Sequence, residues 1–256
     1  MQNQGFSRHT GNMIEAVPLL KKQRALYEVP RGMERFQAYL DLMIDGHPER
    51  LPTLPLQALN PMAREHVAER LDELIAAGAD GWLQDFAAEL NARLPDRPDR
   101  KICWVMVDDV KGGWTHRYLN DASARFNQAK YHLDWIPVML WVSEDIKQEN
   151  LRRSAFSNAF RHFYMLQHGA PETLQQMLDQ EGQAQRFAEI PLTFSAEELE
   201  YTSEVLRPHL QSTHFPTLFT CMYGDHIAEK VGYPPQGLSD LAGFEWSLAQ
   251  ALKQHI

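Results

Sequence analysis

The first third of the chain carries apolar residues at the spacing of amphipathic helices. Between residues 33 and 44 they recur every three or four positions and so share one helical face. A helix is also expected over about 61–77, because Asn60 and the proline after it favour a helix start and Gly78 favours its end. Another helix is expected over about 82–94.

Two short runs of consecutive apolar residues predict strands at about 102–107 and 136–142. An unbroken apolar run of this length is typical of a strand that is covered on both faces. The segment between them has a helical pattern over about 121–131, so the two strands can form one parallel βαβ unit. Antiparallel pairing is equally compatible with the pattern.

The remainder of the chain has helical patterns again. A long helix is expected over about 144–168, closed by Gly169. Ser195 followed by Glu198 matches a capping box, and a final helix is expected over about 244–253. The pattern therefore predicts a predominantly α-helical α+β protein, in which helices pack around a small sheet built on the two strands.

Chain length favours a single compact domain over residues 1–256, since 256 residues is near the upper limit for one hydrophobic core. A polar, proline-bearing connection at 94–99 offers an alternative division. It would separate a helical N-terminal part, 13–94, from a strand-containing part, 100–256.

Composition narrows the class of protein. Hydrophobic residues make up 44% of the chain and charged residues 23%, which is ordinary for a folded domain. The formal net charge of −9 argues against general nucleic-acid binding, which needs a field of Lys and Arg. The longest apolar run, Trp135 to Val142, is far shorter than the about 20 residues of a membrane-spanning helix, so no membrane partner is expected.

Two cysteines, Cys103 and Cys221, lie in apolar stretches and form no CxxC motif. We interpret both as buried free thiols in a reducing compartment. The polar N-terminus, Met1 to Thr10, has no hydrophobic signal core. These features together predict a cytoplasmic protein.

The densest candidate chemistry directly follows the first predicted strand. Asp108 and Asp109 come first, and His116 lies a short way beyond them. Ligand sites gather at the carboxyl ends of parallel strands, so these three residues are the candidate acid and base groups. Between them, Gly112 and Gly113 allow backbone N–H groups to converge on an anion.

Other polar and aromatic residues complete the candidate site. The predicted substrate-binding residues are Lys111, Gly112, Gly113, Trp114, Arg117 and Arg152. The same stretch also fits an ordinary surface turn that Trp114 anchors to the core. Asp108 or Asp109 together with His116 can ligate a divalent metal. The cationic side chains of Lys111 and Arg117 make an anion or polar substrate the preferred ligand. No motif identifies a cofactor.

Arg152 is a candidate because of its place on the long predicted helix. It shares a face with Phe156 and Phe163, which predicts a buried guanidinium paired with an acid, and Asp108 or Asp109 is the expected partner.

For the other polar residues of that helix we expect structural roles. Arg161 and His168 lie on the polar face, where solvation is expected, and His162 reads as a core or boundary residue.

The sequence is compatible with two functions. The leading hypothesis is an enzyme that acts on a small polar or anionic substrate at the strand-end loop 108–117. The alternative is a non-catalytic protein-interaction module. An enzyme should gather its polar residues in one concave pocket, whereas an interaction module should present a flat apolar patch.

Overall fold

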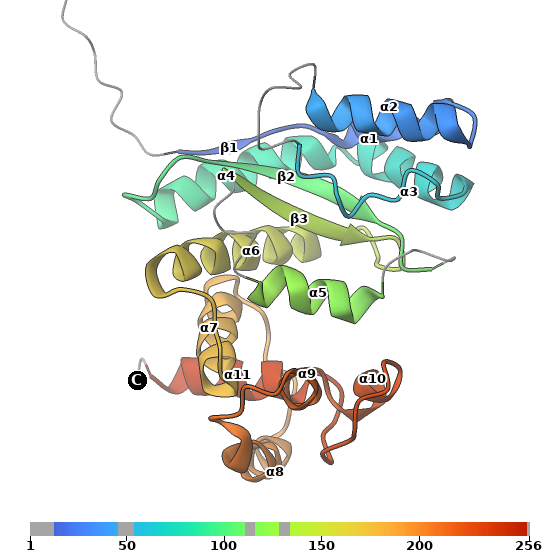
Figure 1. Cartoon of the computed structure of the whole chain (residues 1–256). Helices are drawn as coiled ribbons and strands as arrows, with labels where there is room; N and C mark the ends of the chain where they lie inside the picture. Colours follow the sequence, from blue (N-terminus) through green and yellow to red (C-terminus); the bar gives the residue numbers. More distant parts are fainter. Residues whose placement is uncertain (1–12, 46–53, 111–115, 128–133, 255–256) are drawn as a thin grey trace, which may run out of the picture.

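A computed structural model describes residues 13–45, 54–110, 116–127 and 134–254 of the chain (Figure 1). Its centre is a three-stranded, fully parallel sheet in the order β1-β2-β3. The strands are β1 (Ile14–Ala16), β2 (Arg100–Val107) and β3 (Trp135–Trp141). The fold class predicted from the sequence is therefore confirmed, and the pairing left open between β2 and β3 is parallel.

The predicted strands pair over their whole apolar length. Lys101 lies opposite Trp135, and the register continues to Val107 opposite Trp141. The third strand, β1, was not predicted from the sequence. It has only three residues, which is too short for an alternating or continuous apolar pattern to stand out.

Helices between β1 and β2 cover part of the sheet. They are α1 (Leu20–Ala25), the 3₁₀ turn η1 (Leu26–Glu28), α2 (Met33–Ile44), α3 (Glu65–Ala76) and α4 (Ala79–Arg93). α4 packs against β1, and α1 packs against α3. The predicted start of α3 is wrong: the Asn60 side chain accepts a hydrogen bond from the backbone of Met62 in a separate turn, and the helix begins at Glu65.

Two helices flank the crossover from β2 to β3 and the exit from β3. α5 (Arg117–Phe126) joins the two strands, and α6 (Gln148–His168) follows β3 and packs against it and against α4. α6 begins four residues later than predicted, because Glu144 and Lys147 donate backbone hydrogen bonds in turns that precede it.

The regular secondary structure of the C-terminal third is helical throughout the part that the structure describes. It contains α7 (Leu174–Phe187), α8 (Ala196–Leu206), the 3₁₀ turn η3 (Arg207–His209), α9 (Phe215–Tyr223), α10 (Asp225–Glu229) and α11 (Ala242–Lys253). Ser195 forms the predicted capping box with Glu198 at the start of α8. These helices form a second group, on the far side of α5 and α6 from the sheet (Figure 1).

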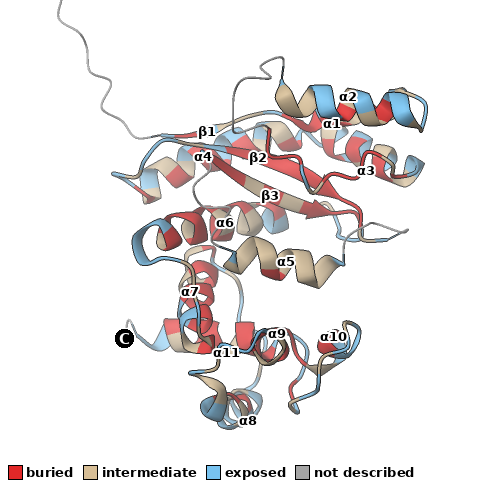
Figure 2. Cartoon of the chain, viewed as in Figure 1, coloured by how far each residue is buried: buried red, intermediate tan, exposed pale blue. Residues whose placement is uncertain are grey.

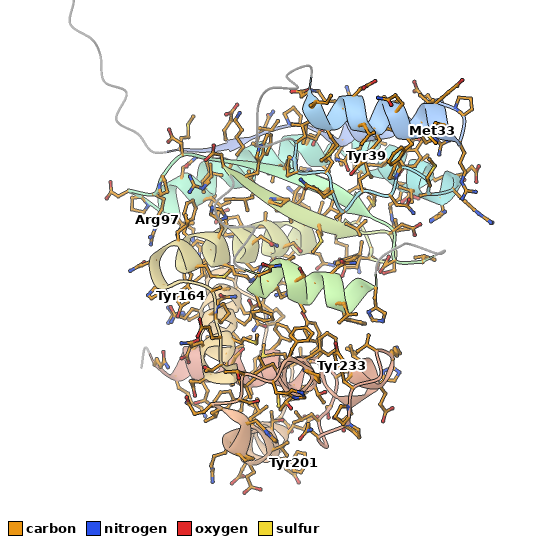
Figure 3. All side chains as sticks on the ribbon, in the orientation of Figure 1. Met33, Tyr39, Arg97, Tyr164, Tyr201 and Tyr233 are labelled. Carbon is orange, nitrogen blue, oxygen red and sulfur yellow. The ribbon has the colours of Figure 1, made fainter. Side chains whose placement is uncertain are left out.

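Two hydrophobic clusters match this arrangement. The first joins the strands to α1, α3, α4 and α6, so residues before and after the connection at 94–99 share one core. The second contains residues of all five helices from α7 to α11 and also Ala122 of α5. Buried segments accordingly occur both around the sheet and within the C-terminal group (Figure 2). Met33 of α2 and Tyr201 of α8 are exposed at the two ends of the molecule (Figure 3).

Within the described ranges, we find no helix that combines the length and the apolar character needed to cross a membrane.

Candidate functional site

The carboxylates that follow β2 are held by neighbouring segments. Asp108 is buried, and its Oδ1 lies 3.0 Å from Nε2 of His66 on α3. Asp109 accepts hydrogen bonds from the backbone N–H and the hydroxyl of Ser143, at 3.0 and 2.6 Å. Arg117 adds a third donor to Asp109 at 3.1 Å. The two acids thus tie the carboxyl ends of β2 and β3 to α3 and α5.

The other predicted residues of this loop divide into two groups. His116 is exposed at the N-terminal boundary of α5, with its ring centroid 6.2 Å from that of Tyr118. The predicted substrate-binding residues Lys111, Gly112, Gly113 and Trp114 lie outside the described residues.

The predicted partner of Arg152 is wrong. Its guanidinium pairs with Glu89 of α4 at 2.5 Å and with Glu189 at 3.3 Å, and it lies 4.2 Å from the ring centroid of Phe156. The reason is the rotation of α6: this side of the helix faces α4 and the end of α7, away from Asp108 and Asp109. Arg152 is only partly buried there.

A cavity of about 560 Å³ lies between the sheet side of the molecule and the C-terminal helices. One wall comes from α5, the end of β3 and α6, and the other from α7, α9, α11 and the segment 190–191. Ligand sites prefer such positions between packed units and near the carboxyl ends of parallel strands. Among the described residues of the predicted site, Arg117 lines this cavity.

A polar stripe on α6 supplies much of the cavity wall. Its members are Asn150, Arg153, Ser154, Ser157, Asn158 and Arg161. These residues recur at intervals of three and four, so they share one helical face. This stripe was not predicted from the sequence, because the apolar face dominates the pattern of the helix. A polar row inside a helix that is apolar elsewhere was the signal available.

Arg161, at the end of this stripe, is buried within the protein. The expectation that it is solvated is wrong, since it is buried and binds the fully buried Glu181 of α7 through Nε at 2.5 Å and Nη2 at 3.0 Å. Arg125 of α5 donates to the same carboxylate at 2.7 Å. Burial alone would raise the pKa of Glu181, but the two arginines outweigh it and lower the pKa to about 2.

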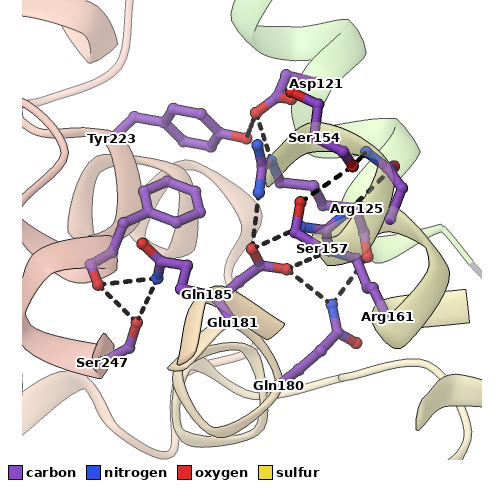
Figure 4. A network of polar contacts seen from close by, with 12 residues as sticks. Asp121, Arg125, Ser154, Ser157, Arg161, Gln180, Glu181, Gln185, Tyr223 and Ser247 are labelled. Atoms are coloured by element: carbon purple, nitrogen blue, oxygen red, sulfur yellow. Dashed lines mark hydrogen bonds and ion pairs between the residues drawn. The ribbon is translucent and has the colours of Figure 1, made fainter. Parts of the chain in front are cut away.

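The network extends from Glu181 across the cavity to α9 (Figure 4). Asp121 of α5 accepts hydrogen bonds from Nε of Arg125 and from the hydroxyl of Tyr223, both at 2.7 Å. Burial and the nearby carboxylate of Asp121 raise the pKa of Tyr223 well above its usual range. Tyr223 therefore stays protonated and acts as a hydrogen-bond donor at physiological pH.

Arg117 contacts two aromatic rings and two carboxylates at the end of the cavity nearest the carboxyl ends of the strands. Its guanidinium lies 5.6 Å from the ring centroid of Tyr118 and 5.4 Å from that of Trp141. It pairs with Asp109 and with Glu144. Partial burial raises the pKa of Glu144, and Arg117 opposes that rise. A carboxyl group with a raised pKa in a cavity wall is suited to proton transfer.

Arg153 differs from the other three arginines of the cavity. Its Nε lies 3.0 Å from Oε1 of Glu149, one turn earlier on α6. Neither terminal amino group of Arg153 has a hydrogen-bond partner among the described residues, whereas Arg117, Arg125 and Arg161 donate through terminal groups to carboxylates. Arg153 thus presents a guanidinium fork that can bind a carboxylate or phosphate with two parallel hydrogen bonds.

Other candidate chemistries have less support in the described structure. No group of three or more His, Cys, Asp or Glu side chains is placed to hold a metal ion within the described ranges. Cys103 and Cys221 are free and buried, as predicted. Burial raises the pKa of both thiols, that of Cys221 to about 12. His162 is buried, as predicted, and its Nε2 accepts a hydrogen bond from Arg100 at 2.8 Å.

Comparisons of this chain with protein families, with curated proteins and with solved structures found no match. The site is therefore interpreted from its own geometry.

Proposed function

We propose that this protein is an enzyme that acts on a small anionic substrate with a carboxylate or phosphate group, bound in the cavity between α6 and the C-terminal helices. The observation that carries the proposal is the open guanidinium fork of Arg153 in the cavity wall. An arginine whose terminal amino groups have no acidic partner in the protein gains two charge-assisted hydrogen bonds when a ligand supplies the acid.

Two neighbouring groups support catalysis in addition to binding. Glu144 has a raised pKa in the same wall, so it can donate or accept a proton near the substrate. Tyr223 supplies a hydroxyl that is fixed by Asp121. In this proposal the loop after β2 is the edge of the site, where Asp109 positions Arg117 and Arg117 positions Glu144.

Composition supports the setting of this activity. The net charge of −9 fits a small-molecule substrate better than a nucleic acid. Two free thiols fit a reducing compartment, so we place the protein in the cytoplasm.

The test of the proposed function is ligand-induced stabilisation of wild type and Arg153→Gln. A thermal-shift panel of inorganic phosphate, simple carboxylates, sugar phosphates and nucleotides is measured for each. A ligand at 100 times its dissociation constant should stabilise the wild type by about 2.7 kcal/mol. Arg153→Gln should lose most of that stabilisation, because it removes the charge and one arm of the fork.

A matched control separates the site from general charge effects. Arg207→Gln makes the same chemical change at an exposed position in η3 and should respond to the panel as the wild type does. Equal ligand responses in Arg153→Gln and the wild type would exclude Arg153 as the anion-binding group. A panel without any stabilising anion would remove the support for an anionic substrate.

A further inference from the structure

A second pocket, of about 250 Å³, lies beside the charged cavity. Its walls include Val105 of β2, Trp135, Ile136 and Pro137 of β3, and Pro55 and Ala58 from the segment before α3. These side chains are apolar, in contrast to the arginines and carboxylates that line the cavity next to it.

The two spaces meet over β3, between α5 and α6. Ala124, Met139, Asn158 and Arg161 line both of them. Ala124 is the α5 residue at this junction, and Met139 is the β3 residue. The charged cavity and the apolar pocket therefore share part of their walls, one being mainly charged and the other mainly apolar.

The distance from Arg153 to the junction follows from the geometry of α6. Arg153 and Arg161 are eight positions apart on this helix, which corresponds to roughly 12 Å at about 1.5 Å per residue. Because Arg161 lies at the junction, a ligand whose anionic group binds Arg153 must extend by about this length along β3 before it enters the apolar pocket.

We propose that the substrate is an anionic amphiphile, with its charged group at Arg153 and an extended alkyl chain that passes Ala124 into the apolar pocket. This inference rests on the proposed function, because it takes Arg153 as the anion site. It adds the chemical class of the rest of the substrate. Burial of the chain supplies affinity, while the arginine fork fixes which end enters the charged cavity.

A series of straight-chain carboxylates from acetate to tetradecanoate, each kept below the concentration at which it forms micelles, tests the proposal by titration calorimetry. Each methylene that enters the pocket is worth about 0.8 kcal/mol, which corresponds to about fourfold tighter binding. Affinity should therefore rise along the series and level off once the pocket is full. Arg153→Gln should weaken every member that binds.

Ala124→Leu places a larger side chain at the junction and should remove most of the gain between decanoate and tetradecanoate. Ser123→Leu is the control: it adds the same side chain at the neighbouring α5 position, which lines neither space, and should keep the full gain. Thermal melts establish that both variants fold, and the wild-type series stands as a test if Ala124→Leu does not.

The outcomes separate the two proposals. Short and long acids that bind with equal affinity would overturn the amphiphile and leave the anion site intact. A gain with chain length that persists in a folded Ala124→Leu variant would place the chain elsewhere and also overturn it. If neither this series nor the ligand panel shows binding that depends on Arg153, the proposed function itself fails. Sedimentation with phosphatidylglycerol vesicles, but no binding of monomeric acids, would assign the anion to a lipid surface and overturn a free substrate.

Discussion

The negative charge of Glu181 is stabilised by arginines from other helices. Its carboxylate is fully buried in α7, and the arginines that neutralise it come from α6 and α5. Removing the charge of one member of such a buried group leaves the remaining charges without compensation, which is far more costly than the loss of a surface pair. Arg152 is the contrasting case, because the side chains of its partners Glu89 and Glu189 are 41% and 59% exposed.

Glu181→Gln should lower the free energy of unfolding at pH 7 by about 3–5 kcal/mol, because Arg161 stays buried without a carboxylate and Arg125 keeps only Asp121 as an acidic partner. Chemical denaturation measures the loss. Glu204→Gln, at an exposed position in α8, is the control and should change stability by less than about 0.5 kcal/mol.

The same residue predicts a pH dependence. The folded state lowers the pKa of Glu181 to about 2 from an ordinary value of 4.5, so its stabilising contribution is complete above about pH 4.5. The contribution decreases as the pH falls from there toward 2. The stability of the wild type should therefore approach that of Glu181→Gln over this interval. Parallel stability curves for the two proteins from pH 7 to pH 3 would contradict the assigned pKa shift.

Helix contacts in the C-terminal group require close backbone approach. A Cβ atom on Gly182 of α7 would lie 2.3 Å from the carbonyl oxygen of Ser247 in α11, and one on Gly243 of α11 would lie 2.4 Å from the carbonyl oxygen of Cys221 in α9. These glycines let α11 pack directly against the backbones of α7 and α9. α7 in turn carries Glu181, so this packing also places the polar network beside the cavity.

Gly182→Ala should destabilise the protein by about 1–3 kcal/mol, because α7 and α11 must move apart to admit the methyl group. Gly81→Ala in α4 is the matched control, since nothing lies within 4 Å of its added Cβ and alanine is the better helix former. That control should be neutral or stabilising by up to about 1 kcal/mol. Thermal denaturation of both variants measures the difference. Equal stability of the two variants would show that α7 and α11 are not in close contact in solution.

On the scale of the whole molecule, two hydrophobic clusters share a charged boundary. The first surrounds the sheet, the second fills the C-terminal helices, and the cavity lies between them. The ion pair of Arg161 with Glu181 crosses this boundary and is buried on both sides. Separate unfolding of either group would expose one charge and leave the other behind in a partly folded structure, which favours cooperative unfolding.

The two cysteines test this cooperativity, since Cys103 belongs to the first cluster and Cys221 to the second. Both thiols are buried with raised pKa values, so neither should react with a thiol reagent in the native protein. Across a urea series, both should become reactive at the same midpoint, as measured by mass spectrometry of the two labelled peptides. Labelling of Cys221 at a clearly lower urea concentration would show that the C-terminal helices unfold on their own.

Local sequence features determined much of the fold. Unbroken apolar runs predicted β2 and β3, periodic apolar positions predicted α2, α4 and α6, and the capping box at Ser195 predicted α8. Apolar periodicity and helix caps depend on residues that lie close together in the sequence, so they can be recognised without the tertiary structure. The same reasoning placed Arg117 and Asp109 at a strand end, where the structure joins them in an ion pair.

Tertiary structure alone decided which polar groups meet. The sequence showed neither that Asp108 pairs with His66, nor that Arg152 turns toward α4, nor that Arg161 is buried against Glu181. Each of these pairs joins residues from different elements, and their meeting depends on the rotation and packing of whole helices. The cavity has the same origin: the open fork of Arg153 becomes a candidate anion site because the C-terminal helices pack opposite α6 and enclose it.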